Sequence, residues 1–198
     1  MLLTLAKITW DAVVIQYWFG LTIVLVLFVA STLFSCKNDK AETNKEAAVA
    51  ETPNNQFKVT LNVIAKSEDD FCLLYTQDGS TNFKDEVVWQ HVKGNPNEQQ
   101  VVFVLPADTY PTQLRFDLGI KKEQGDIILK SVVCEYKGKK KEIYGSELGL
   151  LFRPDESKCT FDPTTGVIKA IVKDGLKQIP SMYPQETNLG PVLKKLAE

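Results

Sequence analysis

The chain has 198 residues, a formal net charge of −2 and 24% charged residues. Charges of both signs are interspersed, which argues against a nucleic-acid-binding protein, because such a protein carries a clustered basic face. The part after Cys36 has about 160 residues, which suits a single domain of ordinary size.

The N-terminal part of the chain contains an apolar run that predicts attachment to a membrane. No charged residue occurs from Ala12 to Cys36, and roughly 20 apolar residues suffice to cross a bilayer core. One interpretation is a single membrane-spanning helix, with Asp11 on one side and Lys37 on the other. The true start of the protein is left open, because Lys7 is the only cationic side chain among residues 1–20.

The end of this run supports a second interpretation. Leu33–Cys36 (LFSC) resembles a bacterial lipobox, and the resemblance implies a signal peptide of residues 1–36 that is cut before an acylated Cys36. Lys37–Lys40 (KNDK) resembles the surface-export signal of Bacteroidetes lipoproteins. Together the two resemblances imply a lipoprotein on the surface of the outer membrane. The alternative is an inner-membrane protein with a periplasmic domain.

The next segment, Lys37–Gln56, is polar, charged and rich in alanine, and it contains no aromatic residue. It lacks the apolar surface that would offset the entropy of ordering. We therefore expect a flexible tether that lifts the following domain by about 25 Å.

From Phe57 onward the sequence predicts strands. Apolar residues alternate with polar ones in Phe57–Val63, as in a half-buried strand. Further strands are expected at Phe71–Thr76, Glu86–Val92, Gln99–Leu105, Gln113–Leu118, Asp126–Tyr136, Lys141–Tyr144, Leu148–Phe152 and Gly166–Lys173. Short strands separated by Gly and Pro turns predict an all-β domain of residues 57–176, an antiparallel β-sandwich or barrel.

Residues 177–198 are expected to form a C-terminal extension with a short helix. Thr187 or Asn188 is the expected cap, with Pro191 in the first turn. The apolar stripe of this helix would consist of Leu189, Val192, Leu193 and Leu196. We expect the stripe to pack against the sandwich or cover a strand edge, the alternative being a partner-binding helix.

Residues 101–140 resemble jelly-roll modules of the galactose-binding-like type. The resemblance rests on the strand end Leu114–Gly119 (LRFDLG) and on the following strand of the IILKSVV pattern, while the alternation by itself predicts that Leu114, Phe116 and Leu118 face inward. It covers about forty residues and implies a jelly-roll-like fold rather than an activity.

If Cys36 carries lipid, three cysteines remain: Cys72, Cys134 and Cys159. Outside the cytosol two of them could form a disulfide, and three pairings are possible. Two of them lie in apolar strand-like runs, where a free thiol behaves as a small buried hydrophobe, so we interpret these cysteines as structural. The chain has one histidine, His91, and no CxxC pair, which argues against a metal site.

No catalytic pattern stands out, so we expect a protein that is not an enzyme. The carboxylates of Glu68–Asp70 and Asp85–Glu86 fall in predicted turns and are interpreted as solvated. The basic run Lys137–Lys141 lies between two predicted strands and is interpreted as a solvated hairpin turn. A Gly-rich phosphate loop and an HExxH pair are both missing from the sequence.

Binding is the favoured function. Trp89 is expected on the polar face of its strand beside His91, and sugars stack on such a ring while polar groups bind their hydroxyls. Further polar groups of this predicted site are Tyr75, Asp78, Arg115 and Asp117. The alternative is that Trp89 is a core residue under a loop. The oxygen-rich turn 78–82 could hold a structural calcium ion, although turn chemistry alone explains its composition.

The sequence therefore predicts a membrane-anchored lipoprotein whose single β-sandwich binds extracellular carbohydrate without catalysis and without a cofactor. The alternative is a structural or adhesive subunit of a cell-envelope assembly, which would contact protein through a sheet edge or the C-terminal helix.

Overall fold

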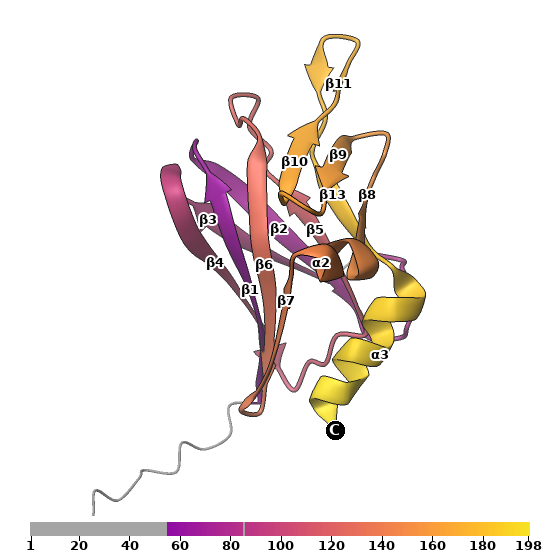
Figure 1. Cartoon of the computed structure of the whole chain (residues 1–198). Helices are drawn as coiled ribbons and strands as arrows, with labels where there is room; N and C mark the ends of the chain where they lie inside the picture. Colours follow the sequence, from indigo (N-terminus) through magenta and orange to yellow (C-terminus); the bar gives the residue numbers. More distant parts are fainter. Residues whose placement is uncertain (1–54, 85) are drawn as a thin grey trace, which may run out of the picture. The chain divides into compact units, whose positions relative to one another are not determined.

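The structure is a computed structural model that describes residues 55–84 and 86–198 (Figure 1). The predicted anchor, the predicted lipidation site Cys36 and nearly all of the predicted tether lie outside these residues. In the described part of the chain, no helix is both long enough and apolar enough to cross a membrane. The described residues belong to one compact unit, Ala50–Glu198.

The domain consists mostly of strands. The strands are β1 (Gln56–Ala65), β2 (Asp69–Thr76), β3 (Val87–Val92), β4 (Asn95–Ala107), β5 (Gln113–Leu118), β6 (Ile127–Tyr136), β7 (Lys139–Tyr144), β8 (Phe152–Pro154), β9 (Cys159–Asp162), β10 (Val167–Ala170), β11 (Val172–Lys173), β12 (Leu176–Lys177) and β13 (Ser181–Pro184). The helices are α2 (Ser146–Leu151) and α3 (Glu186–Ala197).

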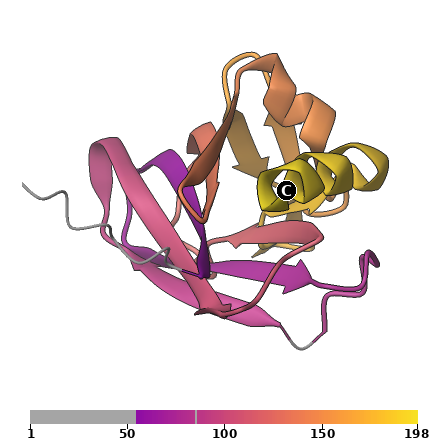
Figure 2. The same ribbon diagram turned by 90° about the horizontal axis from the view of Figure 1, so that it is seen from below.

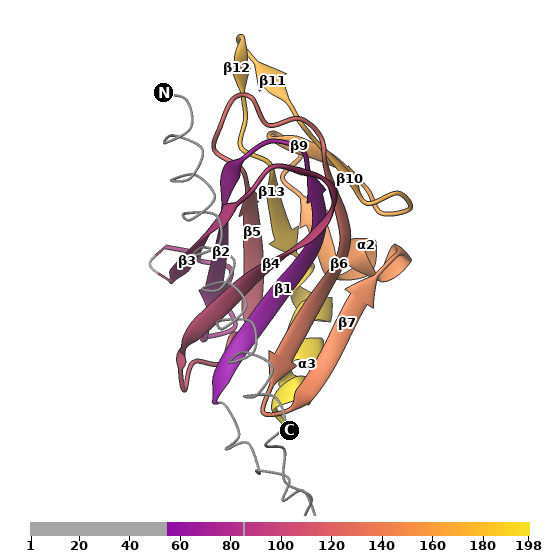
Figure 3. The ribbon, with the colours of Figure 1, turned by 90° about the vertical axis from the view of Figure 1, so that its left-hand side faces the viewer.

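Two antiparallel sheets form the body of the domain. The larger has the order β4-β1-β6-β10-β9, with β7 also paired to β6, and the five-stranded sheet has the order β3-β2-β5-β13-β8. Figure 3 shows the larger sheet in front of the other. The short hairpin β11–β12 projects at the end opposite the C-terminus of α3 (Figures 1 and 3). The predicted all-β, antiparallel and β-sandwich-like architecture is thus confirmed.

The core lies between the sheets and follows the alternation of the sequence. Phe57, Val59 and Leu61 of β1 are completely buried, as are Phe116 and Leu118 of β5. One continuous cluster of buried side chains contains residues of both sheets and of both helices. Since successive side chains of a strand point to opposite faces, the inward set in β1 and β5 could be predicted from the sequence.

The chain crosses from the five-stranded sheet to the larger one between β3 and β4, and Gly94 makes this corner possible. A Cβ atom at Gly94 would lie 2.7 Å from the carbonyl oxygen of Lys66 and 2.8 Å from the amide nitrogen of Glu68. Any other side chain would therefore push the two segments apart, which is a common reason for glycine in a sheet.

Two predicted strands were wrong in part. Residues Ser146–Leu151 form α2 where a strand was predicted, with Leu148 and Leu151 buried. Apolar residues three positions apart fit one face of a helix, and a short apolar run does not distinguish the two structures. The segment Gly166–Lys173 is divided between β10 and β11.

The C-terminal residues are closely integrated with the sheets. Strand β13 lies between β5 and β8. Helix α3 begins at Glu186, so the predicted cap at Thr187 or Asn188 was placed too late and Pro191 lies inside the helix rather than in its first turn. Its leucines are buried in the core, as expected for a helix that packs against the sandwich.

Candidate functional site: the outer face of the five-stranded sheet

Polar and aromatic side chains gather on the solvent-facing side of the five-stranded sheet. We call this surface the Trp89 face and define it by Asp70, Cys72, Trp89, His91, Arg115, Asp117 and Tyr183. Strands β2, β3, β5 and β13 contribute these residues. In β2 and β5 the intervening residues, among them Leu73 and Phe116, are buried in the core.

The register of the strands fixes the arrangement on this face. Cys72 pairs with Trp89 on one side and with Asp117 on the other, so these three residues form one row across the sheet. Asp70 pairs with His91 in the next row of β2 and β3. Directly paired residues of an antiparallel sheet project to the same face with Cβ atoms about 5 Å apart.

Trp89 is the most prominent residue of the face. Its exposed fraction is 56%, while Val92 of the same strand is 1% exposed. The prediction that Trp89 lies on the solvent side of its strand is confirmed, and the alternative of a core residue under a loop is wrong. An indole ring that stays in water is available to a ligand with an apolar surface.

Charged groups continue the face beyond Trp89. His91 Nδ1 lies 2.9 Å from Asp70 Oδ1, and His91 Nε2 lies 4.0 Å from Glu68 Oε1. Lys121 Nζ donates a hydrogen bond of 2.8 Å to the same Glu68 oxygen. This bond and the ammonium charge lower the pKa of Glu68, and in return Glu68 raises the pKa of Lys121. The lowered pKa means that the Glu68 carboxylate is ionised at neutral pH.

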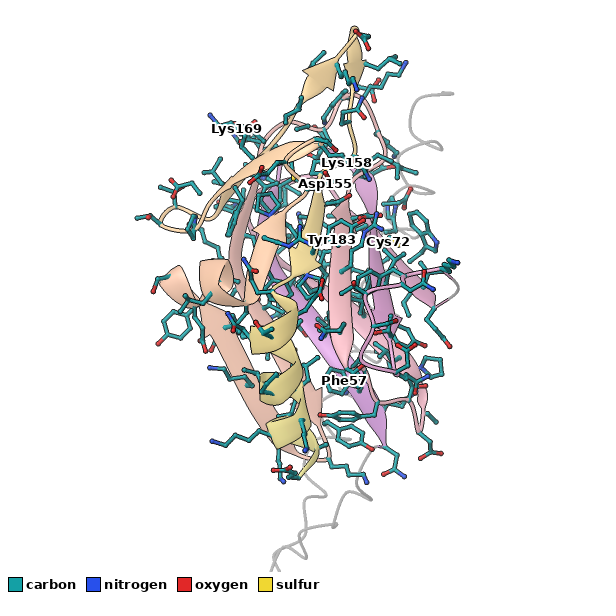
Figure 4. The ribbon with its side chains drawn as sticks, turned by 90° about the vertical axis from the view of Figure 1, so that its right-hand side faces the viewer. Phe57, Cys72, Asp155, Lys158, Lys169 and Tyr183 are labelled. Carbon is teal, nitrogen blue, oxygen red and sulfur yellow. The ribbon has the colours of Figure 1, made fainter. Side chains whose placement is uncertain are left out.

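A second polar group lies on β5 and β13. Arg115 donates two hydrogen bonds to Asp117, of 2.9 Å to Oδ1 and 2.7 Å to Oδ2. The Arg115 guanidinium also lies 4.5 Å from the centre of the Tyr183 ring, and Arg153 lies 5.5 Å from it. Figure 4 shows Tyr183 and Cys72 on this side of the domain. The bidentate hydrogen bonds to Asp117 and the cation–π contact with Tyr183 fix the orientation of the Arg115 side chain.

The thiol of Cys72 is unreactive, although Cys72 lies in the middle of the Trp89 face. Its exposed fraction is 3%, and burial, followed by the charge of Asp117, raises its pKa to about 12. A protonated thiol is a poor nucleophile and a poor metal ligand. Cys134 and Cys159 are likewise buried, and all three thiols are free.

The structure separates two of the six predicted binding residues from the others. Tyr75 is 2% exposed and belongs to the core, where burial and the hydrogen bond from its hydroxyl to Glu86 raise its pKa to about 12. Asp78 lies in the loop after β2. Tyr75 and Asp78 line a hollow of about 320 Å³ together with Asn82, Lys84 and Glu86. Trp89, His91, Arg115 and Asp117 share the Trp89 face, as the alternation predicts.

The oxygens of the turn 78–82 are used within the loop. Asp78 Oδ1 accepts the amide of Ser80, Ser80 Oγ accepts the amide of Asn82, and the Ser80 carbonyl accepts the Thr76 hydroxyl. These oxygens already serve the loop itself. Among the described residues there is no group of three or more His, Cys, Asp or Glu side chains that could hold a metal ion.

Two features of the face were missed by the sequence reasoning. Glu68–Asp70 were interpreted as solvated turn residues, but Asp69 and Asp70 belong to β2, and Asp69 is completely buried. Tyr183 lies on β13, which was not predicted because a strand of four residues that ends at Pro184 is too short to show an alternation. Asp70 lies two residues before Cys72 and therefore on the same face of β2, but Asp69 beside it is also polar, so the sequence alone did not distinguish the buried aspartate from the exposed one.

Comparison with known proteins adds no family. No protein-family model matches the chain, and no curated protein matches it.

Proposed function

We propose that the chain is a membrane-anchored extracytoplasmic lipoprotein whose sandwich domain binds carbohydrate without catalysis through the Trp89 face. The observation that carries the proposal is Trp89 itself, an indole ring more than half exposed on the outer face of the sheet. The apolar side of a sugar ring can stack on this indole. The neighbouring His91–Asp70 pair and Glu68 offer donors and acceptors for the hydroxyl groups of the same sugar.

Two points support the cellular part of the proposal. The LFSC motif at Leu33–Cys36 and the following KNDK segment resemble lipoprotein signals, which favours attachment through Cys36 at the outer membrane surface. The alternative of an inner-membrane anchor with a periplasmic domain would present the same binding face to the periplasm.

We propose a jelly-roll-like fold of the galactose-binding-like type, and two strand pairs fit this proposal. In a jelly roll the first strand pairs with the last and the second with the one before it, in a nested manner. Here β1 pairs with β6 and β2 pairs with β5. The innermost pair of such a set is not formed, because β3 pairs with β2 in the five-stranded sheet and β4 pairs with β1 in the larger one.

The protonation of Cys72 supports a non-catalytic role. It is the cysteine of the Trp89 face, and its raised pKa keeps it in the unreactive thiol form. The hydroxyl of Tyr75 is similarly held in its neutral form by burial and Glu86.

A structural or adhesive subunit of an envelope assembly is the second candidate, and the hairpin β11–β12 is the observation that favours it. Val172 is 66% exposed and Leu176 58% exposed on this projecting hairpin. Val172 pairs with Lys177 and Leu176 pairs with Lys173, so the two apolar side chains lie on opposite faces of the hairpin, and a protein that enclosed the tip would bury both. Helix α3 is the weaker contact for such an assembly, since Leu189 and Leu193 of its apolar stripe are buried in the core.

The proposal is tested by screening the full chain, kept in mild detergent, against printed oligosaccharides and by calorimetric titration with any that bind. We expect saturable binding that Trp89→Ala weakens by at least about tenfold, the equivalent of about 1.4 kcal/mol. Tyr144→Ala is the matched control, because Tyr144 is an aromatic residue with 65% exposure on β7 of the other sheet.

The outcomes separate the two candidates. Binding that is lost in Trp89→Ala and kept in Tyr144→Ala supports the Trp89 face. A folded chain that binds no oligosaccharide, or that binds equally well without Trp89, refutes carbohydrate recognition by this face. Paired substitution of Val172 and Leu176 by Ser then tests whether an envelope protein co-purifies through the hairpin.

A further inference from the structure

A groove with a cationic rim and an apolar floor lies between β7 and α3. Its volume is about 580 Å³. The lining residues, which define the lysine groove, are Lys139, Lys140, Lys141, Glu147, Val192, Lys195 and Leu196. The basic hairpin predicted from residues 137–141 is present as the β6–β7 turn, but the structure adds side chains of α3 that the sequence did not connect with it.

The inner side of β7 changes from apolar to cationic as the strand approaches the hairpin. Ile143, Lys141 and Lys139 pair with Val132, Cys134 and Tyr136 of β6, all of which belong to the core. Along this row Ile143 is buried, Lys141 is half-buried and Lys139 is exposed. The groove therefore opens outward at the end of the sheet, where the core gives way to lysine side chains.

Most of the positive charge of the groove is not neutralised. Lys141 Nζ forms an ion pair of 2.6 Å with Glu147. Within the described part of the chain, no carboxylate lies within 4.0 Å of the amino groups of Lys139, Lys140 or Lys195. Lys139 and Lys195 border an apolar floor formed by Val192 and Leu196, while Lys140 lines the rim from the other face of β7, where it pairs with Glu135. The groove therefore suits an anion that also has an apolar part.

The lysine groove lies at the end of the domain where the chain enters from the N-terminal side. Lys58 of β1 pairs with Glu135 of β6, which in turn pairs with Lys140 of β7. Figures 1 and 3 show the start of β1, the β6–β7 turn and the C-terminus of α3 at this same end. Figure 2 looks onto that end and brings the last turn of α3 to the front. In Figure 4 Phe57 lies beside α3.

We infer that the lysine groove docks the domain onto an anionic phospholipid surface. The inference rests on the proposed membrane anchor, whose tether joins the domain at this end and keeps the groove within reach of the bilayer. Phosphate headgroups would meet Lys139, Lys140 and Lys195, and the glycerol and first methylene groups would meet the apolar floor. Lysine clusters near a membrane are attracted by anionic leaflets within about one screening length.

The chemistry of the groove favours a lipid over an acidic protein. All four rim cations are lysines, whose compact charges and flexible stems suit mobile phosphate groups. Recognition of a peptide carboxylate more often uses the planar fork of arginine. The described arginines, Arg115 and Arg153, both lie on the five-stranded sheet, outside the groove.

The test uses the full chain reconstituted into vesicles of phosphatidylcholine alone, or of phosphatidylcholine with about one third phosphatidylglycerol. Lysines are acetylated briefly and the rate at each position is read by mass spectrometry. We expect acetylation of Lys139, Lys140 and Lys195 to slow several-fold on the anionic vesicles only. The exposed lysines Lys122 and Lys173 lie away from the groove and should react equally on both vesicles.

Two double variants sharpen the test. Lys139→Gln with Lys195→Gln should abolish the protection of Lys140 on anionic vesicles. Lys122→Gln with Lys173→Gln removes the same charge elsewhere and should leave that protection intact. Protection should also disappear at about 1 M salt, where the screening length falls to about 3 Å. Equal labelling on both vesicles, or protection that survives loss of the two groove lysines, overturns the inference.

A soluble anion and a failed anchor give different results. Protection of the groove lysines by free glycerol phosphate on neutral vesicles would assign the groove to a soluble phosphate and overturn docking to a lipid surface. Flotation with neutral vesicles tests the anchor alone. A chain without a working anchor does not float with neutral vesicles. In that case we still expect the chain to float with anionic vesicles at low salt, and the Lys139→Gln/Lys195→Gln variant to lose this flotation. If the unaltered chain does not float with anionic vesicles, the inference is overturned.

Discussion

A single buried carboxylate holds one end of the five-stranded sheet together. Asp69 is completely buried, and its Oδ1 accepts the amides of Asp70 and Ile120, each at 2.8 Å, and of Lys121 at 3.1 Å. The last two amides belong to the loop after β5. Gly119 of this loop has a φ of +88°, and a Cβ atom there would lie 2.4 Å from Asp69 Oδ2. The loop therefore folds around the carboxylate.

We predict that Asp69→Ala lowers the free energy of unfolding by about 3 kcal/mol or more, because three amides lose a charged acceptor. Urea unfolding of the segment Ala50–Glu198, which forms a compact unit, measures the change. Asp70→Ala is the control, since its carboxylate pairs with the exposed His91 and should contribute less than about 1 kcal/mol. Equal losses in the two variants would contradict the proposed role of Asp69.

At the scale of the element, the turn between β9 and β10 depends on one glycine. Gly166 has a φ of +76°, and a Cβ atom there would lie 2.2 Å from the Leu129 carbonyl oxygen. The Gly166 carbonyl accepts the Leu129 amide at 2.8 Å, which joins the turn to β6. Gly138 in the β6–β7 turn has nearly the same φ of +78° but no atom within 4 Å of the added position.

We predict that Gly166→Ala and Gly138→Ala differ in effect although their backbones are alike. Gly138→Ala should cost about 1–2 kcal/mol, the strain of a left-handed backbone. Gly166→Ala should cost clearly more, because its methyl group also clashes with β6. Thermal unfolding of both variants gives the comparison, and equal midpoints would show that the contact with Leu129 adjusts freely.

Helix α3 stabilises the sheets as part of the core. Leu193 is 1% exposed, and its carbonyl accepts a hydrogen bond from the Tyr110 hydroxyl. Gln113 Nε2 donates to the Glu186 carbonyl at 3.1 Å, which fixes the start of the helix on β5.

We predict that Leu193→Ala lowers the free energy of unfolding by about 3 kcal/mol, the usual cost of a cavity at a buried leucine. Lys194→Ala, at the neighbouring exposed position, should change it by less than about 0.5 kcal/mol. Chemical denaturation of the two variants measures both changes in the free energy of unfolding. A small effect of Leu193→Ala would mean that α3 contributes little to the stability of the sheets.

At the scale of the whole molecule, buried thiols and phenols make stability depend on alkaline pH. Burial raises the pKa of Cys72 and Cys134 from 9.0 to about 12. It also raises the pKa of Tyr75 and Tyr110 from 10.0 to about 12. The folded domain holds these protons more tightly, so the unfolded chain ionises first as the pH rises. The stabilisation is complete below about pH 9 and is lost as the pH approaches 12.

We therefore predict that the urea midpoint of Ala50–Glu198 falls steeply between about pH 9 and about pH 11. Recovery of the midpoint after return to pH 8 excludes chemical damage. A midpoint that stays constant up to pH 11 would mean that the thiols and phenols titrate equally in the folded and unfolded states.

Most long strands could be predicted from the sequence, and the short ones could not. Strand β5 was predicted with its observed bounds, and β1, β2 and β3 nearly so. Strands β1 and β5 carry the alternation of a half-buried strand, and β2 carries a short apolar run. Strand β13 and helix α2 are too short for such a pattern. Pairing with β5 and β8 makes Ser181–Pro184 a strand, and those partners are far away in the sequence.

The sequence by itself determined which side chains of β1 and β5 point inward and which outward, whereas the structure decided that Trp89 is exposed. The sequence also determined the basic character of the β6–β7 turn. Only the tertiary structure decided that Asp70 lies opposite His91, that Asp69 is buried, and that α3 completes the lysine groove. The reason is that alternation is a local property of the pleated backbone, whereas strand register and helix docking depend on contacts between residues far apart in the chain.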